Sequence, residues 1–252
     1  MTVPLFRRSL CTFAATIASA EAVPCDAQGY TVGGSRPSQA TKLKLHAELA
    51  TSGDKHVVAL PKLGLALPAG PSLELGIDAH LRHIDRNDTE RVSGIGDVEF
   101  KAKYLLLDAR NNAARIDMSA ELKLSLPTGD AVRGLGDGQP AVKLPITFSH
   151  RRGPWEFGGL LGAQFVYRRD KTTLLAGALA TRTLGREIKV GAEVATEMRY
   201  RDPGTQEIMA NVGFRYQPNP KTELFVIAGR SLEARDGRPV AKFKLGLEIV
   251  LD

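Results

Sequence analysis

The chain has 252 residues, 34 of them basic and 28 acidic, which gives a formal net charge of +6. Because the basic residues are interspersed with acidic ones and form no stripe, the composition argues against nucleic-acid binding. No segment approaches the run of roughly twenty apolar residues that a spanning helix needs, so a helical membrane protein is excluded.

The first twenty residues are organised like a secretory signal peptide. Arg7 and Arg8 precede an apolar run from Leu10 to Ala18, and the small-residue pattern Ala18-Ser19-Ala20 follows. The run is about ten residues long, which is too short to span a bilayer as a helix. We therefore expect cleavage after Ala20, which leaves 32 basic and 28 acidic residues in the mature chain.

The segment from Glu21 to Ala40 is rich in Gly, Pro, Ser and Gln and has no periodicity, which predicts a periplasmic arm or tether. Whether this arm enters and plugs the following domain is left open by the sequence. Cys25 is the only cysteine outside the signal, so no disulfide or cysteine-based metal site can form within one chain. The residues before Cys25 match a lipoprotein processing site poorly.

From Thr41 onward, apolar and polar residues alternate with period two, which is typical of strands with one apolar and one polar face. Many of these segments run ten to thirteen residues, and about nine to eleven are needed for a tilted strand to cross a bilayer. We count about twelve, an even number that suits a closed up-and-down antiparallel transmembrane β-barrel, although ten or fourteen remain open. The expected strands are Thr41–Ser52, Val57–Leu67, Pro71–Arg82, Ile95–Leu107, Ala114–Leu126, Gln139–His150, Pro154–Tyr167, Thr172–Thr183, Arg186–Arg199, Glu207–Gln217, Thr222–Leu232 and Arg238–Leu251.

The predicted connections alternate between short and long. The two longest, His83–Gly94 and Pro127–Gly138, fall on the same side as Tyr200–Gln206, whereas the turns on the other side are mostly short and rich in Gly or Pro. Outer-membrane barrels show this asymmetry, with short periplasmic turns and longer loops outside.

Two Gly-Asp motifs carry a family resemblance. Gly94-Ile95-Gly96-Asp97 is followed by Leu124 to Asp130, then by Gly134-Leu135-Gly136-Asp137-Gly138, and the stretch from Gly153 to Val166 continues the pattern. Together they resemble the outer-membrane family of transporters of the meta pathway of phenol degradation, over most of Ser93–Asp252. The resemblance implies an outer-membrane β-barrel that passes small organic compounds, aromatic ones included, and it brings no set of catalytic residues to carry over.

Charged residues occupy the polar face of the expected strands, which in a barrel is the lumen. The alternative is that these charged side chains fill a narrow barrel with ion pairs, so that the barrel conducts nothing. The candidates for lining the lumen are Asp97, Glu99, Lys101, Lys103, Asp117, Glu121, Lys123, Glu187, Lys189, Glu193, Glu197, Arg199 and Arg215.

The sequence supports an enzymatic function and a metal site less well than it supports a channel. A phospholipase barrel needs a serine and a histidine within hydrogen-bonding reach, but Ser149 and His150 are adjacent in a strand and point to opposite faces. His80, His83, Asp85 and Asp88 could be read as a metal cluster, although such a loop end is more often only solvated. We therefore expect no enzyme, no metal and no cofactor.

The sequence thus predicts a passive conduit whose partners are the lipid bilayer, the barrel-assembly machinery and small organic solutes. The chain's end supports assembly, because Lys244-Leu245-Gly246 with Ile249 and Leu251 resembles a final-strand signal. Two rivals remain: a non-conducting barrel that presents the loop His83–Gly94, and a soluble β-rich envelope protein.

Overall fold

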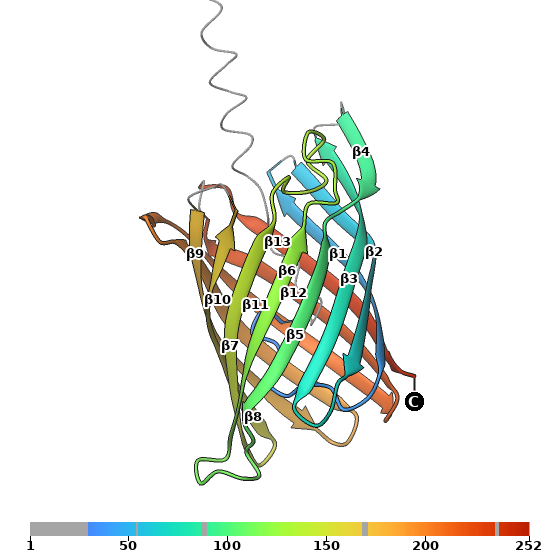
Figure 1. Cartoon of the computed structure of the whole chain (residues 1–252), viewed down its shortest axis with the longest axis vertical. Coiled ribbons are helices and arrows are strands. Elements are labelled where there is room, and N and C mark those ends of the chain that lie inside the picture. The colour runs from blue at the N-terminus through green and yellow to red at the C-terminus, as the bar shows by residue number, and fades with distance from the viewer. Residues whose placement is uncertain (1–29, 54, 87–89, 168–170, 235–236, 252) are drawn as a thin grey trace, which may run out of the picture.

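The computed structural model describes residues 30–251 except 54, 87–89, 168–170 and 235–236, and the predicted signal peptide lies outside this range. Strands make up nearly all of it (Figure 1). They are β1 (Lys42–Ser52), β2 (Lys55–Pro68), β3 (Leu73–Arg86), β4 (Glu90–Ile95), β5 (Val98–Leu107), β6 (Ile116–Leu126), β7 (Ala141–Arg152), β8 (Trp155–Val166), β9 (Lys171–Leu184), β10 (Ile188–Arg199), β11 (Asp202–Asn219), β12 (Thr222–Glu233) and β13 (Val240–Val250).

The strands form one closed antiparallel barrel. β1 pairs with β13 on one side and β2 on the other, β2 also pairs with β3, and the remaining strands pair in chain order. β4 and β5 both pair with β3 and form two halves of the fourth strand, which is interrupted at Gly96 and Asp97. The barrel therefore has twelve strands, and the predicted fold class is confirmed.

Two predicted connections are wrong. We expected a loop over His83–Gly94, but β3 runs to Arg86 and pairs with β4 from Leu81↔Ile95 to Arg86↔Glu90, so this segment is a hairpin that projects from the barrel (Figure 1). It is stabilised by apolar packing, because Ile84, Val92 and Leu135 form a buried cluster. Likewise β11 begins at Asp202, so most of the expected loop before Glu207 is strand.

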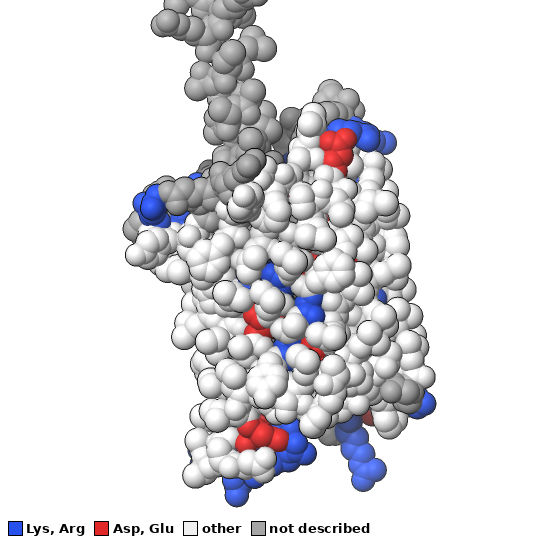
Figure 2. All heavy atoms as spheres, viewed as in Figure 1, with Lys and Arg blue, Asp and Glu red and all other residues white. Residues whose placement is uncertain are grey.

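The two faces of the wall differ as the alternation predicts. Outward side chains such as Leu161 and Val212 are 61% and 62% exposed, while inward Lys103, Lys123 and Glu193 are at most 3% exposed. Figure 2 shows uncharged atoms over most of one face, with charged groups at its two ends and a small group of charged atoms visible between the uncharged ones near the middle. The molecule is therefore inverted relative to a soluble protein, with apolar residues outside and ionised groups inside.

The two ends of the barrel also differ. At the end that carries the C-terminus, short turns join the strands except between β5 and β6, which residues 108–115 connect. In one of the short turns, Ala69 N–H donates to Leu73 O over 2.8 Å. At the other end lie the β3–β4 hairpin and the connection between β6 and β7 (Figure 1). Aromatic side chains mark both ends, with Trp155 at the first and Tyr167 and Tyr200 at the second.

Among the residues that the structure describes, no helix is long and apolar enough to cross a membrane.

Candidate functional site

The lumen contains the end of the N-terminal arm. Residues 30–40 precede β1, which starts at the C-terminal end of the barrel, where Leu251 N–H donates to Thr41 O over 3.0 Å. From there the arm runs up into the barrel, and Tyr30, Val32 and Ser35 are only 1–2% exposed. The arm described here is therefore enclosed by the wall.

Near the entrance, an arginine of the arm is held by two carboxylates of the wall. Arg36 Nη2 lies 2.9 Å from Asp108 Oδ1 and 2.6 Å from Asp117 Oδ1. Asp108 belongs to the turn after β5, and hydrogen bonds from Arg110 and from Arg36 hold the pKa of its carboxyl well below its usual range. The carboxylate therefore stays ionised through mildly acidic pH, and Arg36 keeps its charged partner.

Serine side chains fasten the next residue. Ser35 Oγ lies 2.6 Å from Ser149 Oγ of β7, and Ser119 Oγ of β6 donates to Ser35 O. One step deeper, Lys103 Nζ of β5 donates to Gly34 O over 3.1 Å. Three neighbouring strands thus hold this part of the arm through side chains alone.

Deeper still, one carboxylate caps the arm's backbone. Glu193 of β10 accepts hydrogen bonds from Thr31 N at 2.8 Å and Val32 N at 2.9 Å, one on each oxygen. Asn211 Nδ2 of β11 donates to Glu193 Oε1 over 2.6 Å and orients it. Buried backbone N–H groups must find a partner, and an ionised acceptor is a strong one.

The side chains of Tyr30 and Val32 lie in an apolar seat. Tyr30 packs with Phe225 and Ile227 of β12, and Val32 packs with Leu160 of β8 and Leu175 of β9. Inward glycines leave the room: a Cβ at Gly177 would lie 2.8 Å from Val32 Cγ2, and one at Gly213 would lie 2.5 Å from Tyr30 Oη. Arg215 lies over the Tyr30 ring, 5.6 Å from its centroid. The wall is shaped around these two side chains.

Opposite this seat is a row of lysines. Lys101, Lys123 and Lys143 are direct cross-strand partners on β5, β6 and β7. Like charges placed opposite each other repel, and nearby carboxylates offset the repulsion: Lys101 Nζ lies 2.6 Å from Asp78 Oδ2 and Lys123 Nζ 3.6 Å from Glu121 Oε2. The β6–β7 ladder is interrupted beside this row, where Pro145 has no N–H to donate.

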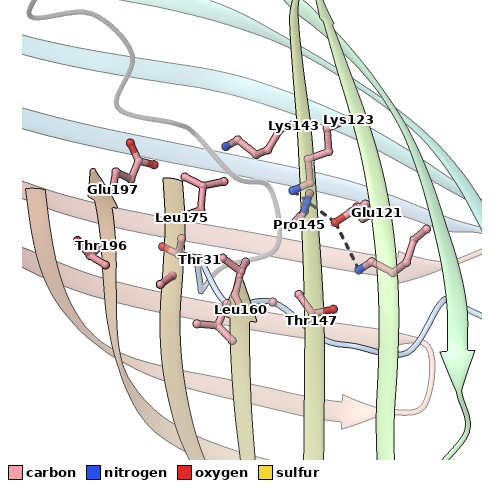
Figure 3. A pocket seen from close by; sticks show the side chains of 14 residues that line it. Thr31, Glu121, Lys123, Lys143, Pro145, Thr147, Leu160, Leu175, Thr196 and Glu197 are labelled. Carbon is pink, nitrogen blue, oxygen red and sulfur yellow. Dashed lines mark ion pairs between the residues drawn. The ribbon is translucent and has the colours of Figure 1, made fainter. Parts of the chain in front are cut away.

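A small cavity lies between the arm and this row of lysines. Figure 3 shows Thr31, Leu160 and Leu175 on one side of it and Lys123, Lys143 and Glu121 on the other.

The predicted lumen residues fall into three groups. Lys103, Asp117, Glu121, Lys123 and Glu193 are buried on the inner side of the wall, and Lys101 is nearly so. Half-buried residues on the same side include Glu99, which lies 3.3 Å from Lys101, Lys189, which lies 3.1 Å from Glu156, and Arg215, which lies 3.3 Å from Glu223, together with Glu197 and Arg199. Two differ: Glu187 is exposed in the turn before β10, and Asp97 lies at the break in the fourth strand. That the first two groups line a solute path stays a prediction.

Asp97 organises the long β6–β7 connection. Its Oδ1 accepts from Gly129 N at 2.9 Å and its Oδ2 from Asp137 N at 2.7 Å. The two Gly-Asp motifs found in the sequence therefore meet in space, with the carboxylate of the first capping the backbone of the second. Leu135, which lies between Gly129 and Asp137 in the chain, is buried against Ile84 and Val92 of the β3–β4 hairpin.

We expect Asp97→Ala to loosen this connection and leave the barrel intact. The change removes a charged acceptor from two N–H groups, each bond contributing about 1.5–3 kcal/mol. Arg133 lies exposed within the connection, so trypsin should cut after it much faster in the variant. Asp85→Ala, which removes only the exposed ion pair with Arg91, is the matched control. Unchanged cleavage in Asp97→Ala would contradict the assigned role.

The residues considered for a metal site and for a phospholipase do not come together in space. His80 lies against Gly96, His83 Nδ1 lies 2.7 Å from Ser93 Oγ, and Asp85 pairs with Arg91, while Asp88 lies outside the described residues. Among the described residues, no group of three or more His, Cys, Asp or Glu could hold a metal ion. Ser149 faces the arm, whereas His150 Nδ1 lies 3.1 Å from Arg115 O on the exposed side.

The sequence left open whether the arm enters the lumen, and the structure places residues 30–36 there. A signal was present, because Leu160, Leu175, Phe225 and Ile227 are apolar at positions that alternation assigns to the inner face. Inward apolar side chains in a polar lumen indicate that something apolar packs on them.

The chain matches a known protein family over most of its length. Residues 27–240 match the family described as "Putative MetA-pathway of phenol degradation", which is most of the chain and includes the arm, both Gly-Asp motifs and all strands up to β12. The chain belongs to this family. The resemblance expected over most of Ser93–Asp252 is thus confirmed as far as residue 240, and the match extends further toward the N-terminus. No curated protein matches the chain.

Two porins are among the solved structures that are similar to this family member. The KdgM porin matches with a TM-score of 0.57 at 11% identity, over 83% of this chain and 99% of its own. The NanC porin matches with a TM-score of 0.60 at 7% identity, over 83% of this chain and 100% of its own. At these identities the likeness shows the fold alone, a porin-like β-barrel.

Proposed function

We propose that the protein is an outer-membrane channel through which small organic solutes, aromatic ones included, diffuse passively. The observation that carries the proposal is the inverted barrel: a continuous apolar outer face, which only lipid suits, surrounds an inner face of ionised side chains such as Lys103, Lys123 and Glu193. An eight-stranded barrel is filled by its side chains, whereas twelve strands leave more room inside.

Membership in the phenol-degradation family supports aromatic solutes, and a related fold supports charged ones. A structure of the KdgM porin is a complex with disordered oligogalacturonate, and it matches this chain with a TM-score of 0.56 at 12% identity, over 84% of this chain and 99% of its own. The lysine row of β5–β7 gives the lumen here a basic side that suits carboxylates. We place the short turns in the periplasm, after export and cleavage of the signal peptide. Solutes cross the channel without any covalent step.

Planar-bilayer conductance tests the channel. Two refolded chains are compared, one that begins at Glu21 and one that begins at Pro37, so that an occupied lumen is not mistaken for a missing channel. Discrete openings from at least one of them support the proposal. If both refold as barrels and stay silent, the rival non-conducting barrel that presents the β3–β4 hairpin is favoured.

The lysine row should set the ion preference. In the chain that begins at Pro37, we expect Lys123→Glu with Lys143→Glu to shift the reversal potential in a salt gradient toward cations, because two inward positive charges become negative. Lys221→Glu, on an exposed residue of the turn between β11 and β12, is the matched control and should shift it little. Equal shifts in both would show that solutes do not pass this row.

A further inference from the structure

We infer that residues 30–36 are a plug that closes the channel to organic solutes, so that these residues must leave their seat before a solute passes. The inference rests on the proposed channel function and concerns the regulation of the same lumen. Three observations carry it: the shape of the seat, the kind of contacts that hold the arm, and the cavity that the arm lines.

The seat is complementary to the arm. Along the inner wall, polar side chains give way to glycine and apolar residues where Tyr30 and Val32 lie. A Cβ at Gly191 would approach Tyr30 Oη to 2.9 Å, and one at Gly177 would approach Val32 Cγ2 to 2.8 Å. Real Cβ atoms rarely come so close to a neighbour. A segment lying in the lumen by chance would not meet a wall hollowed at both of its large side chains.

The contacts that hold the arm can be broken without opening the barrel. Residues 30–40 belong to no strand, and the wall grips them through side chains: Glu193 on two backbone N–H groups, Lys103 on Gly34 O, and Asp108 with Asp117 on Arg36. Each of these wall groups is ionised and can be hydrated once the arm leaves. Release therefore exchanges these polar contacts for water, exposes Tyr30 and Val32 and leaves every strand pair in place.

The seated arm lies beside a cavity in the lumen. Thr31, Val32 and Gly33 of the arm line this cavity together with Lys103, Lys123 and Lys143 of the wall. Since the arm forms one side of this cavity, moving the arm is the change that widens it without moving the wall.

A reversible crosslink tests the plug in the full mature chain. Because the Oγ atoms of Ser35 and Ser149 lie 2.6 Å apart, Ser35→Cys with Ser149→Cys, in a Cys25→Ser background, should form a disulfide that keeps the arm seated. Time-averaged current and the flux of benzoate into vesicles are then measured before and after reduction. The chain that begins at Pro37 serves as the channel without its plug, and the two single-cysteine variants are controls.

We expect the chain that begins at Pro37 to carry at least about tenfold more current and benzoate than the chain that begins at Glu21. The oxidised pair should pass no benzoate, and reduction should restore the level of the full chain. Equal transport by both chain lengths, or benzoate flux through the oxidised pair, would overturn the plug while leaving the channel proposal standing. Silence of both lengths, with both folded, would remove the channel and its plug together. Should the shortened chain not refold, oxidation and reduction of the full chain decide the matter.

Discussion

A single charge on the outer face should destabilise the whole barrel: we expect Val212→Arg to lower the free energy of unfolding by about 2–4 kcal/mol in lipid. Val212 is 62% exposed, lies near the middle of β11 and points away from the inward Asn211. An arginine there would lie near the bilayer centre, where lipid cannot solvate it. Urea titration of the barrel in lipid vesicles, followed by the heat-modifiable mobility of the folded form, measures the loss.

The depth dependence of the cost separates lipid exposure from simple loss of packing. Tyr200→Arg places the same side chain on a residue that is 65% exposed just beyond the end of β10. There the cost should fall to about 0–1 kcal/mol, because an arginine near the interface reaches water. Equal losses at the two positions would argue against a membrane-embedded outer face and revive the soluble envelope protein.

The barrel itself could be predicted because its signal is local. In β6, Met118, Ala120 and Leu122 alternate with inward Asp117, Ser119 and Glu121, and the structure keeps this register against β5 and β7. A strand buried against lipid on one face and water or polar groups on the other leaves period two in the sequence. The strand count followed from repeating that pattern along the chain.

The break in the fourth strand could not be predicted in the same way. Asp97 continues the polar positions of Glu99 and Lys101, so alternation extends the strand through it. Its carboxylate instead accepts from Gly129 and Asp137, more than thirty residues away. Such a contact depends on the closed barrel, which brings β5 and the β6–β7 connection to the same rim.

The arm's place in the lumen could not be predicted for a related reason. Its composition indicates only an extended segment, and each contact that seats it comes from a distant strand, as with Glu193, which lies more than 160 residues from Thr31 and Val32. The complementary half of the signal lies in β8, β9 and β12, whose inward apolar residues blur the alternation there. The arm and these inward apolar residues cannot be matched to each other from the sequence, because they come together only when the strands close into a barrel.

Filling the seat should expel the arm from an otherwise unchanged wall, and Gly177→Val is the sharpest way to do so. The new side chain would begin 2.8 Å from Val32 Cγ2 but 3.3 Å or more from the nearest atoms of the wall itself, Val194 O and Ala195 Cβ. Overpacking of this kind costs about 1–3 kcal/mol, and each 1.4 kcal/mol changes an equilibrium about tenfold. The unseated population should therefore rise by about tenfold or more.

Two readouts follow the arm and the pore in the same variant. A cysteine at position 35, in the Cys25→Ser background, reports seating, because Ser35 is 2% exposed and alkylation there requires release. Gly177→Val should raise both the alkylation rate and the time-averaged current by about tenfold. Gly76→Val adds the same side chain to the inner face of β3, where the nearest atoms belong to Leu65 and Lys101 and not to the arm, and it should change neither. Faster alkylation without more current would mean that the arm leaves its seat but does not limit transport. If the alkylation rate and the current rise together, the channel is open when the arm has left its seat.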